Sequence, residues 1–355
     1  MRSRKLIAYA KSQLFRLGVT GLATTLTVMG AAGISARAAQ AATLTPVTFQ
    51  LNWYPGGYHA GFYVALQQGY YKAEGLSVNI VPGNGSTTAA QLVATGQVAM
   101  GYADADPAME LIAKGAKMRA VATIYQSNPD AVEALSGSGI TSVADLKGKT
   151  VGLPPGSQDA MMPLLLGANG LTMSQVHLVH VATDALIPFL LEHKVDAILG
   201  SVDFYNVTMS ERGVKYVSLP FATNGVPTVS DSIIVTDRFL QAHPSIVRRF
   251  VAASLRGWNY AFHHPAVAVA DIEKSAPGQA QSSRSVYLQL QATASLVCTD
   301  GAKFVGKATP QAWANSQKLL SSVGLLPKGV NPVKYYTYQY LPAQAEMEPC
   351  PVHLP

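Results

Sequence analysis

Hydrophobic and polar positions beyond residue 46 follow two periods in turn, one typical of strands and the other of helices. In residues 47–52 every second position is apolar, which indicates a strand with one buried face, and residues 60–73 form an apolar helical run. Strand patterns recur at 76–82, 98–102 and 118–125, and helix patterns at 86–95 and 107–114. This alternation predicts a mostly parallel sheet covered by helices.

A second alternation begins after the Ser- and Gly-rich segment 136–139. Residues 143–152 predict a short helix, a turn at Gly148 and a strand; further helices are expected at 157–167 and 187–193. Strands are expected at 176–181, 195–200 and 216–219, and the strand at 228–235 is expected to return to the first set. Residues 237–323 are mainly helical in pattern, whereas the Pro- and Tyr-rich tail from 325 to 355 is expected to be irregular.

Two such sets, joined by extended segments, predict an α/β protein with two lobes and a ligand cleft between them. We expect lobe I to comprise residues 42–137 and 231–325, lobe II residues 138–230, and an irregular C-terminal tail residues 326–355. Ligands of open α/β sheets bind at the carboxyl ends of the strands. Polar and aromatic residues just after the predicted strands are therefore the first candidates for a site.

Residues 1–41 have the pattern of a signal peptide: a basic start, an apolar stretch over 17–34, and small residues that predict cleavage near Ala38 or Ala41. The six Lys and Arg residues of this segment account for the formal net charge of +6, so the rest of the chain is neutral overall. A basic surface for nucleic acid or anionic lipid is therefore not indicated. The alternative is an N-terminal membrane anchor, because the apolar run approaches the length of a membrane span.

Cys298 and Cys350 are the two cysteines of the chain. In an oxidising compartment they could pair, or they could remain separate thiols, and their spacing does not decide between these alternatives. Two cysteines so placed give almost no support to a zinc or iron–sulfur site, and no group of His, Asp and Glu has metal-binding spacing. Neither a cofactor nor a metal is expected.

The segment after the first predicted strand carries the strongest candidates for ligand contact. Asn52, Trp53 and Tyr54 lie at the strand end, before a Pro-Gly-Gly break and the next helix. Flat rings offer a stacking surface for a flat ligand, and an amide both donates and accepts hydrogen bonds. His59 is either a further ligand contact or a hydrogen-bonded structural residue.

Two strand–helix loops offer a second kind of candidate. In residues 82–88, Gly83 and Gly85 permit close backbone approach, and Ser86 or Thr87 either caps the helix or helps its N–H groups hold a ligand oxygen. The same alternatives apply to Ser157 and Gln158 in the second lobe.

Carboxylates and further polar groups follow two other predicted strands. Asp104 is expected to accept hydrogen bonds from ligand N–H groups, whereas Asp106, directly before Pro107, resembles a helix N-cap. In the second lobe, one interpretation is that Asp203, Tyr205 and Asn206 point into the cleft; the other is that Phe204 and Tyr205 cover the sheet edge.

The candidate loops share the absence of Lys and Arg over residues 52–65, 83–90, 102–109, 153–163 and 201–209. An anionic ligand would therefore depend on helix N-termini and neutral donors, whereas a neutral heteroaromatic ligand suits the rings, Asp104 and the amides better. No nucleotide-binding glycine motif and no nucleophile elbow occur in the sequence. We expect no catalytic residue and no enzyme activity; a secreted enzyme is the alternative from another functional class.

Four stretches together carry a family resemblance: Leu51-Asn-Trp-Tyr-Pro with the following segment to residue 75, residues 85–101, residues 140–152 and residues 195–200. On these residues the chain resembles the periplasmic solute-binding proteins of ABC importers, in the group that binds alkanesulfonates, nitrate and thiamine-pyrimidine precursors. The opening segment is most similar to the thiamine-precursor branch. The chain departs from that branch at Gly56, where the branch has Asn, and at Asn206, where it tends to have Glu.

The resemblance implies the type II periplasmic-binding-protein fold and a periplasmic, monomeric protein that hands its solute to an ABC permease and its ATPase in the inner membrane. The expected ligand is a small heteroaromatic solute such as a thiamine pyrimidine precursor, and the alternative is an alkanesulfonate, nitrate or another small anion. A related yeast-type enzyme uses a Cys-rich iron motif, and the lack of Cys before Cys298 speaks against that activity. Lobe closure would bring the first-lobe candidates against Ser157, Gln158, Asp203 and Tyr205.

Overall fold

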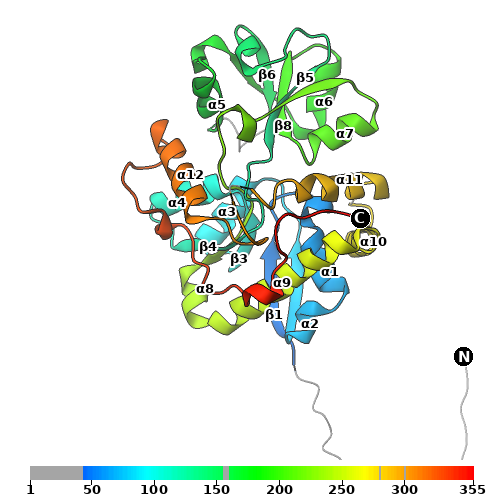
Figure 1. Ribbon diagram of the computed structural model, residues 1–355, viewed down its shortest axis with the longest axis vertical. Helices are drawn as coiled ribbons and strands as arrows, with labels where there is room; N and C mark the ends of the chain where they lie inside the picture. The colour runs from blue at the N-terminus through cyan, green and yellow to red at the C-terminus, as the bar shows by residue number, and fades with distance from the viewer. Residues whose placement is uncertain (1–42, 155–159, 280, 300) are drawn as a thin grey trace, which may run out of the picture. The chain divides into compact units, whose positions relative to one another are not determined.

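The computed structural model describes residues 43–154, 160–279, 281–299 and 301–355 (Figure 1). The signal peptide expected at 1–41, with its cleavage sites, and the candidates Ser157 and Gln158 lie outside these residues. Within the described ranges, no helix combines the length and the apolar character needed to cross a bilayer.

Two five-stranded sheets build the two lobes. The first contains Thr45–Gln50 (β1), Leu76–Val81 (β2), Met100–Ala103 (β3), Met118–Thr123 (β4) and Ser232–Thr236 (β10), in the order β2-β1-β3-β10-β4. The second contains Asp130–Leu135 (β5), Thr150–Leu153 (β6), His177–His180 (β7), Ala197–Ser201 (β8) and Tyr216–Pro220 (β9), in the order β7-β6-β8-β5-β9. The predicted two-lobed α/β fold is confirmed.

Both sheets are mixed, and in the same way. In the first, β1 is parallel to β2 and β3, while β10 runs antiparallel to β3 and β4. In the second, β6 is parallel to β7 and β8, while β5 runs antiparallel to β8 and β9. The antiparallel strands β5 and β10 are the first strands after the chain changes sheet. The chain crosses to the second sheet between β4 and β5 and returns to the first between β9 and β10.

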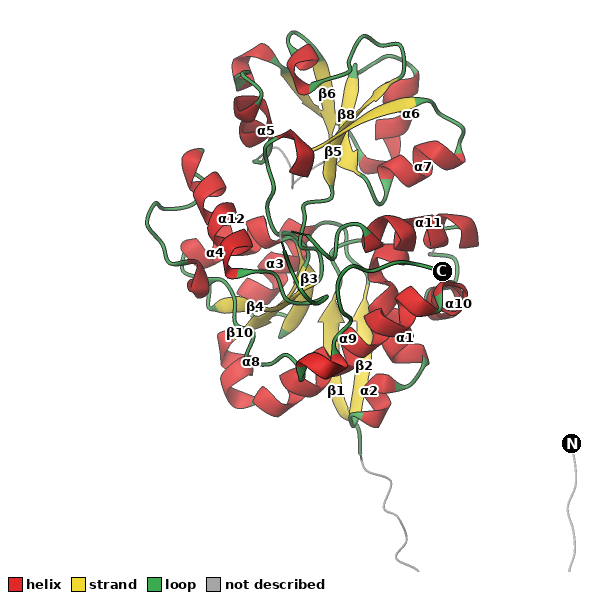
Figure 2. Ribbon diagram, viewed as in Figure 1, coloured by secondary structure: helices red, strands yellow, loops and turns green. Residues whose placement is uncertain are grey.

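Helices flank both sheets (Figure 2). Those before the return to the first sheet are Ala60–Gln67 (α1), Tyr70–Ala73 (α2), Ser86–Ala94 (α3), Ala105–Ala113 (α4), Met162–Ala168 (α5), Leu186–Leu191 (α6) and Tyr205–Glu211 (α7). After β10 follow Asp237–Ala242 (α8), Pro244–His263 (α9), Pro265–Ser275 (α10), Ser283–Ala294 (α11) and Pro310–Ser322 (α12). One of several short 3₁₀ turns, Gly57–His59 (η1), leads directly into α1.

Three local expectations need correction. The single helix expected over 60–73 is two helices, because Gly69 adopts a positive φ of 76°, which glycine accepts without steric cost. Helix α7 begins within the loop that we expected after β8. Strand β5 had no sequence signal, since Asp, Ala and Glu have weak strand propensity; tertiary burial nevertheless makes it a central strand. Strand β5 belongs to the second sheet although it precedes residue 138, where we expected lobe II to begin. The exact lobe boundaries stay a prediction.

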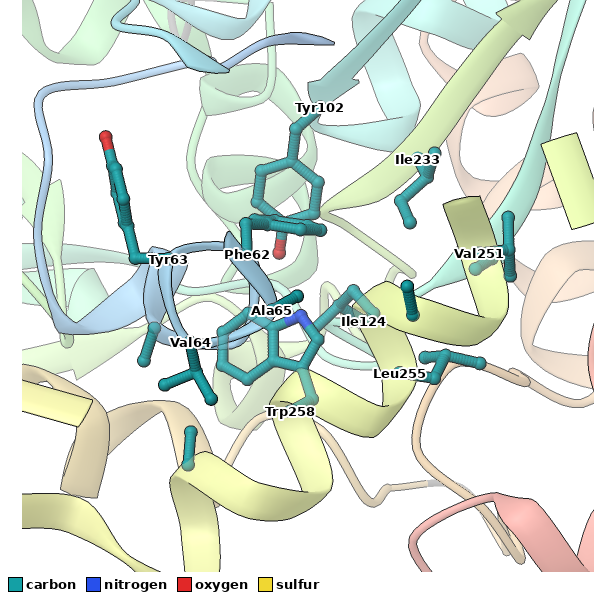
Figure 3. Packing of buried hydrophobic residues seen from close by; sticks show 14 of the residues in the cluster. Phe62, Tyr63, Val64, Ala65, Tyr102, Ile124, Ile233, Val251, Leu255 and Trp258 are labelled. Atoms are coloured by element: carbon teal, nitrogen blue, oxygen red, sulfur yellow. The ribbon is translucent and has the colours of Figure 1, made fainter. Parts of the chain in front are cut away.

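The largest apolar cluster of the first lobe centres on Trp258 of α9 (Figure 3). The Phe62 ring lies between Tyr102 of β3 and Trp258, with centroid distances of 4.9 Å and 5.7 Å and edge-on geometry in both pairs. Such aromatic pairs add to the stabilisation from burial. This packing fixes the start of α1, which directly follows the candidate residues 52–59.

Cys298 and Cys350 form a disulfide with a Cα–Cα distance of 5.6 Å, which decides between the alternatives that the sequence left open. The disulfide ties the C-terminal tail to the segment after α11. The tail is irregular, as expected, apart from short 3₁₀ turns, and it packs on the first lobe: the Thr337 N–H and the Ala120 carbonyl form a 2.8 Å hydrogen bond.

Candidate ligand-binding pocket

A pocket lies between the loops at the facing ends of the two sheets. The empty space between its walls, which includes open solvent, is about 630 Å³. The first-lobe side and the returning crossing contribute Asn52, Trp53, Tyr58, His59, Gly85, Ser86, Asp104 and Asp231. The opposite side is formed by Pro129, Asp130, Pro154, Gly200, Ser201, Asp203, Phe204 and Tyr205.

The structure brings together seven of the residues predicted from the sequence. They come from four separate loops: Asn52, Trp53, His59, Ser86, Asp104, Asp203 and Tyr205. Each lies just after a strand or at the start of a helix, as the strand-end argument predicts.

Three other candidates do not line this pocket. Tyr54 is 50% exposed, with its ring 5.4 Å from that of Trp53. Asn206 lies on α7, and its amide donates a 3.0 Å hydrogen bond to Ser218 in β9. Thr87 follows Ser86 in α3, and successive helical side chains point about 100° apart, so only Ser86 turns to the pocket.

The glycine loop before α3 has a structural role that differs from the one expected. A Cβ at Gly83 would lie 2.1 Å from the Leu51 carbonyl oxygen, so the close backbone approach is to the end of β1. Gly85, not Ser86 or Thr87, stands at the N-cap of α3, and its N–H donates to the Asn52 carbonyl at 2.6 Å. The Ser86 hydroxyl instead accepts from the Asp104 N–H at 3.1 Å.

Asp104, not Asp106, occupies the N-cap position of α4, because the helix begins at Ala105. Its carboxylate does not cap the helix. Asp104 Oδ1 instead accepts a 2.9 Å hydrogen bond from Ser230 Oγ, on the crossing that precedes β10. The backbone turn therefore aims a carboxylate at the pocket rather than at its own helix.

Asn52 connects several lining residues. Its Nδ2 donates to Asp231 Oδ1 at 2.6 Å and to Ser86 Oγ at 3.2 Å, and its Oδ1 lies 2.8 Å from His59 Nε2. Burial lowers the pKa of His59 to about 3, so the imidazole is neutral, and Nε2 carries the proton that the Asn52 oxygen accepts. His59 thus orients the Asn52 amide as well as lining the pocket.

Asp104 and Asp231 form a carboxyl pair. They stand at the adjoining ends of β3 and β10; burial raises the pKa of both groups and the charge of Asp104 raises that of Asp231 further, which favours retention of a proton by the pair. Asp231 is not signalled by its position in the sequence, because it precedes a strand, whereas the predicted site residues follow strands. Asp130, which also lines the pocket, is the first residue of β5.

Asp203 is held from the first lobe. Its Oδ2 accepts a 2.8 Å hydrogen bond from the hydroxyl of Tyr125, which also lies 2.8 Å from Thr293 Oγ1 on α11. Burial raises the pKa of Asp203, while hydrogen bonds from Ser201 and Tyr125 oppose that shift. The contact links the two lobes at the pocket.

Aromatic rings from both lobes meet beside these carboxyl groups. The Phe204 centroid lies 6.0 Å from that of Trp53 and 6.3 Å from that of Tyr58, in edge-on geometry. Tyr205, on α7, is buried and also packs against Gly200. Phe204 and Tyr205 therefore line the pocket and cover the sheet end at once, whereas Asn206 does not line it.

The described lining residues include neither Lys nor Arg, and the described chain contains no group of three or more His, Cys, Asp and Glu side chains that could hold a metal ion. The lining is instead rich in aromatic rings and hydrogen-bond acceptors. Such a surface can hold a flat ring that presents N–H donors.

A family model described as NMT1/THI5 like matches residues 57–268. The chain is 28% identical over 317 residues to the riboflavin-binding protein RibY of Chloroflexus aurantiacus, covering 84% of this chain and 87% of RibY. It is 26% identical over 226 residues to the formylaminopyrimidine-binding protein of Halalkalibacterium halodurans, covering 62% and 68% of the two chains. Over 233 residues it is also 26% identical to a Saccharomyces cerevisiae protein, 4-amino-5-hydroxymethyl-2-methylpyrimidine phosphate synthase THI11, again covering 62% and 68%.

The fold has solved counterparts. The alkanesulfonate-binding protein SsuA from Xanthomonas axonopodis pv. citri, bound to MOPS, aligns with a TM-score of 0.64 at 16% identity, covering 83% of this chain and 98% of SsuA. At this identity the likeness shows the fold alone, and it agrees with the predicted two-lobed periplasmic-binding-protein architecture. The match to the family model spans more than half of the sequence, and the chain therefore belongs to the NMT1/THI5-like family.

Proposed function

We propose that this protein is the periplasmic solute-binding component of an ABC importer and captures a small heteroaromatic solute, such as a thiamine pyrimidine precursor. The proposal includes export by a signal peptide, a monomeric state, and transfer of the solute to a permease and its ATPase. The names of RibY and the formylaminopyrimidine-binding protein support it, since both are binding proteins for ring compounds and the match spans most of each.

The observation that carries the proposal is the chemistry of the pocket. Aromatic rings of Trp53, Tyr58 and Phe204 lie beside carboxyl groups, without Lys or Arg among the described lining residues. A sulfonate or nitrate would meet like charge from Asp203 and from the Asp104–Asp231 pair, which is costly because Asp203 and Asp231 are buried and poorly screened by water. A flat ring with N–H groups finds both a stacking surface and acceptors.

The proposed contacts divide by chemistry. Trp53 and Phe204 stack on the ring, while Asp104, Asp203 and Ser86 hydrogen-bond to its edge. Asn52 and His59 orient these groups, since Asn52 bonds to both His59 and Asp231. Ser157 and Gln158 stay predicted contacts from the second lobe.

Binding without chemistry is part of the proposal, although the yeast relative is named as a synthase. His59, the histidine that lines the pocket, is buried, neutral and hydrogen-bonded to Asn52, which leaves it poorly suited to general-base catalysis. Mass spectrometry of solute recovered after prolonged incubation with purified protein should show it unchanged. A chemically altered solute would contradict this part of the proposal.

Titration calorimetry of Trp53→Ala and Tyr54→Ala tests the site. Stacking on one aromatic ring contributes about 1–3 kcal/mol, so Trp53→Ala should weaken binding of an aminopyrimidine roughly tenfold or more. Tyr54→Ala is the matched control, because the half-exposed Tyr54 lies outside the pocket, and it should change affinity less than about threefold. Tight binding of a taurine-like sulfonate with no binding of pyrimidines or flavins would overturn the proposed ligand class.

A further inference from the structure

Several carboxyl groups gather around the pocket. Asp104, Asp130, Asp203 and Asp231 all line it, and the described lining residues include no Lys or Arg. Asp203 and Asp231 are 6% and 5% exposed, so water screens them poorly. Buried carboxylates of this kind require protons or a positively charged partner.

Neutral donors hold three of these carboxyl groups in place. The Asn52 amide donates to Asp231, Ser230 Oγ donates to Asp104, and the Tyr125 hydroxyl donates to Asp203. These contacts fix the direction of each carboxyl group but bring no positive charge. The arrangement is therefore preorganised for a cation that the described protein does not itself supply.

An independent observation points to a ligand at the same place. Tyr58 lines the pocket and is only 6% exposed, yet its hydroxyl has no hydrogen-bond partner in the described chain. A buried hydroxyl without a partner is costly, so a ligand atom that bonds to it would stabilise the bound state. The rings of Tyr58, Trp53 and Phe204 also line the pocket, and aromatic rings attract a cation through their π faces.

The remaining groups near the Asp104–Asp231 pair add no positive charge. Asp203 and Asp130 lie across the pocket, Asp106 follows on α4, and Tyr102 and Tyr125 approach from β3 and the outgoing crossing. His59, on η1, is neutral. Since the described side chains form no metal-binding group of three, an organic cation fits the pocket better than a metal ion.

We propose that the solute is a flat organic cation, a protonated or N-alkylated nitrogen heterocycle, which takes the place of the proton shared by Asp104 and Asp231. The inference rests on the proposed function and narrows its ligand class. On binding, the cation forms hydrogen bonds or ion pairs with the two carboxylates, and the displaced proton passes to solvent. Affinity for a permanent cation therefore rises with pH, because at low pH a proton competes for the same site.

Two probes of nearly the same shape separate charge from ring stacking. The 1-methyl-4-aminopyridinium ion carries a permanent positive charge, and 4-methylaniline is its neutral counterpart at pH 7.5. In calorimetry with the leader-free protein, the pyridinium ion should bind roughly tenfold or more tightly than 4-methylaniline. Its affinity should fall from pH 8 to pH 5, and buffers of different ionisation enthalpy should reveal proton release of up to about one per ligand.

Asp231→Asn tests the carboxyl pair while keeping an oxygen that can accept from Asn52. This variant should lose roughly tenfold or more in affinity for the pyridinium ion, release fewer protons on binding it, and keep its affinity for 4-methylaniline. Glu192→Gln removes an exposed carboxylate of the second lobe and is the matched control, with no expected change. If Asp231→Asn does not fold, as judged by its thermal unfolding, Asp203→Asn replaces it.

The outcomes separate this inference from the proposed function. Equal affinity for the two probes, a pH-independent affinity for the cation, or binding of a neutral pyrimidine but of neither probe would overturn the inference and leave the function standing. Failure of all heteroaromatic compounds to bind would overturn both.

Discussion

The two sheets share one strand order but place different groups at the pocket. In the first, Ser232 pairs with Ala103, so that Asp231 and Asp104 follow at the adjoining ends of β10 and β3. In the second, Asp130 pairs with Ser201 at the corresponding ends of β5 and β8. Where the first sheet opposes a carboxyl group to a carboxyl group, the second opposes a carboxyl group to a hydroxyl.

This difference gives the two pocket walls different electrostatic demands. Carboxyl groups at adjoining strand ends repel when both are ionised, and the raised pKa of both groups favours retention of a proton by the Asp104–Asp231 pair. Ser201 needs no such proton, and it donates to Asp203, which lies two residues farther along the loop. Burial also raises the pKa of Asp130, so both walls favour a protonated carboxyl group; they differ in that Asp130 opposes a hydroxyl group rather than a second carboxyl group.

The largest expected effect comes from making the second sheet like the first. Ser201→Asp places a new carboxyl group opposite Asp130 and close to Asp203, and it should destabilise the protein by about 2–3 kcal/mol at pH 7. The loss should shrink toward pH 4, where protonation relieves the repulsion. Urea unfolding measures it, with the exposed Ser210→Asp as control; equal losses in both variants would refute the argument.

The converse change makes the first sheet like the second. The pair's raised pKa means that the folded protein retains a proton that the unfolded chain releases above a pKa of about 4. This contribution to stability is therefore complete at acid pH and is lost as pH rises, by about 1.4 kcal/mol per pH unit for one retained proton.

Asp104→Ser should flatten this decline. At pH 8 the free energy of unfolding of the variant should exceed that of the wild type by about 1–2 kcal/mol.

Unfolding free energies of both proteins measured from pH 5 to pH 8 would check the Asp104→Ser prediction. Parallel curves for the two proteins would show that the pair holds no extra proton.

The smallest expected effect concerns the hydrogen bond that holds Asp203. Tyr125→Phe removes the 2.8 Å contact to Asp203 and should cost about 1 kcal/mol of stability, with a several-fold loss of ligand affinity. Thr293→Val removes the other partner of the Tyr125 hydroxyl but spares the bond to Asp203. It should therefore leave affinity nearly unchanged in calorimetry, and an equal loss in both variants would argue against a role for the Asp203 contact.

The sequence predicted the pocket best where one strand end carries its own signal. Trp53, Asp104 and Asp203 each follow a run with clear strand periodicity, so their positions could be inferred from local pattern alone. Tyr58 and Asp231 could not be found this way. Tyr58 lies in a short 3₁₀ turn, and Asp231 matters only because β10 returns beside β3.

The sequence by itself determined the alternation of strands and helices, the aromatic segment at the end of β1, and the lack of Lys and Arg in the loops that face the pocket. These properties are local, because periodicity and composition are written in neighbouring residues. Only the tertiary structure decided that Cys298 pairs with Cys350, that Ser86 bonds to Asp104 rather than capping α3, and that Asp104 meets Asp231. Each of these contacts joins residues distant in sequence, so it depends on strand pairing and packing that no local pattern specifies.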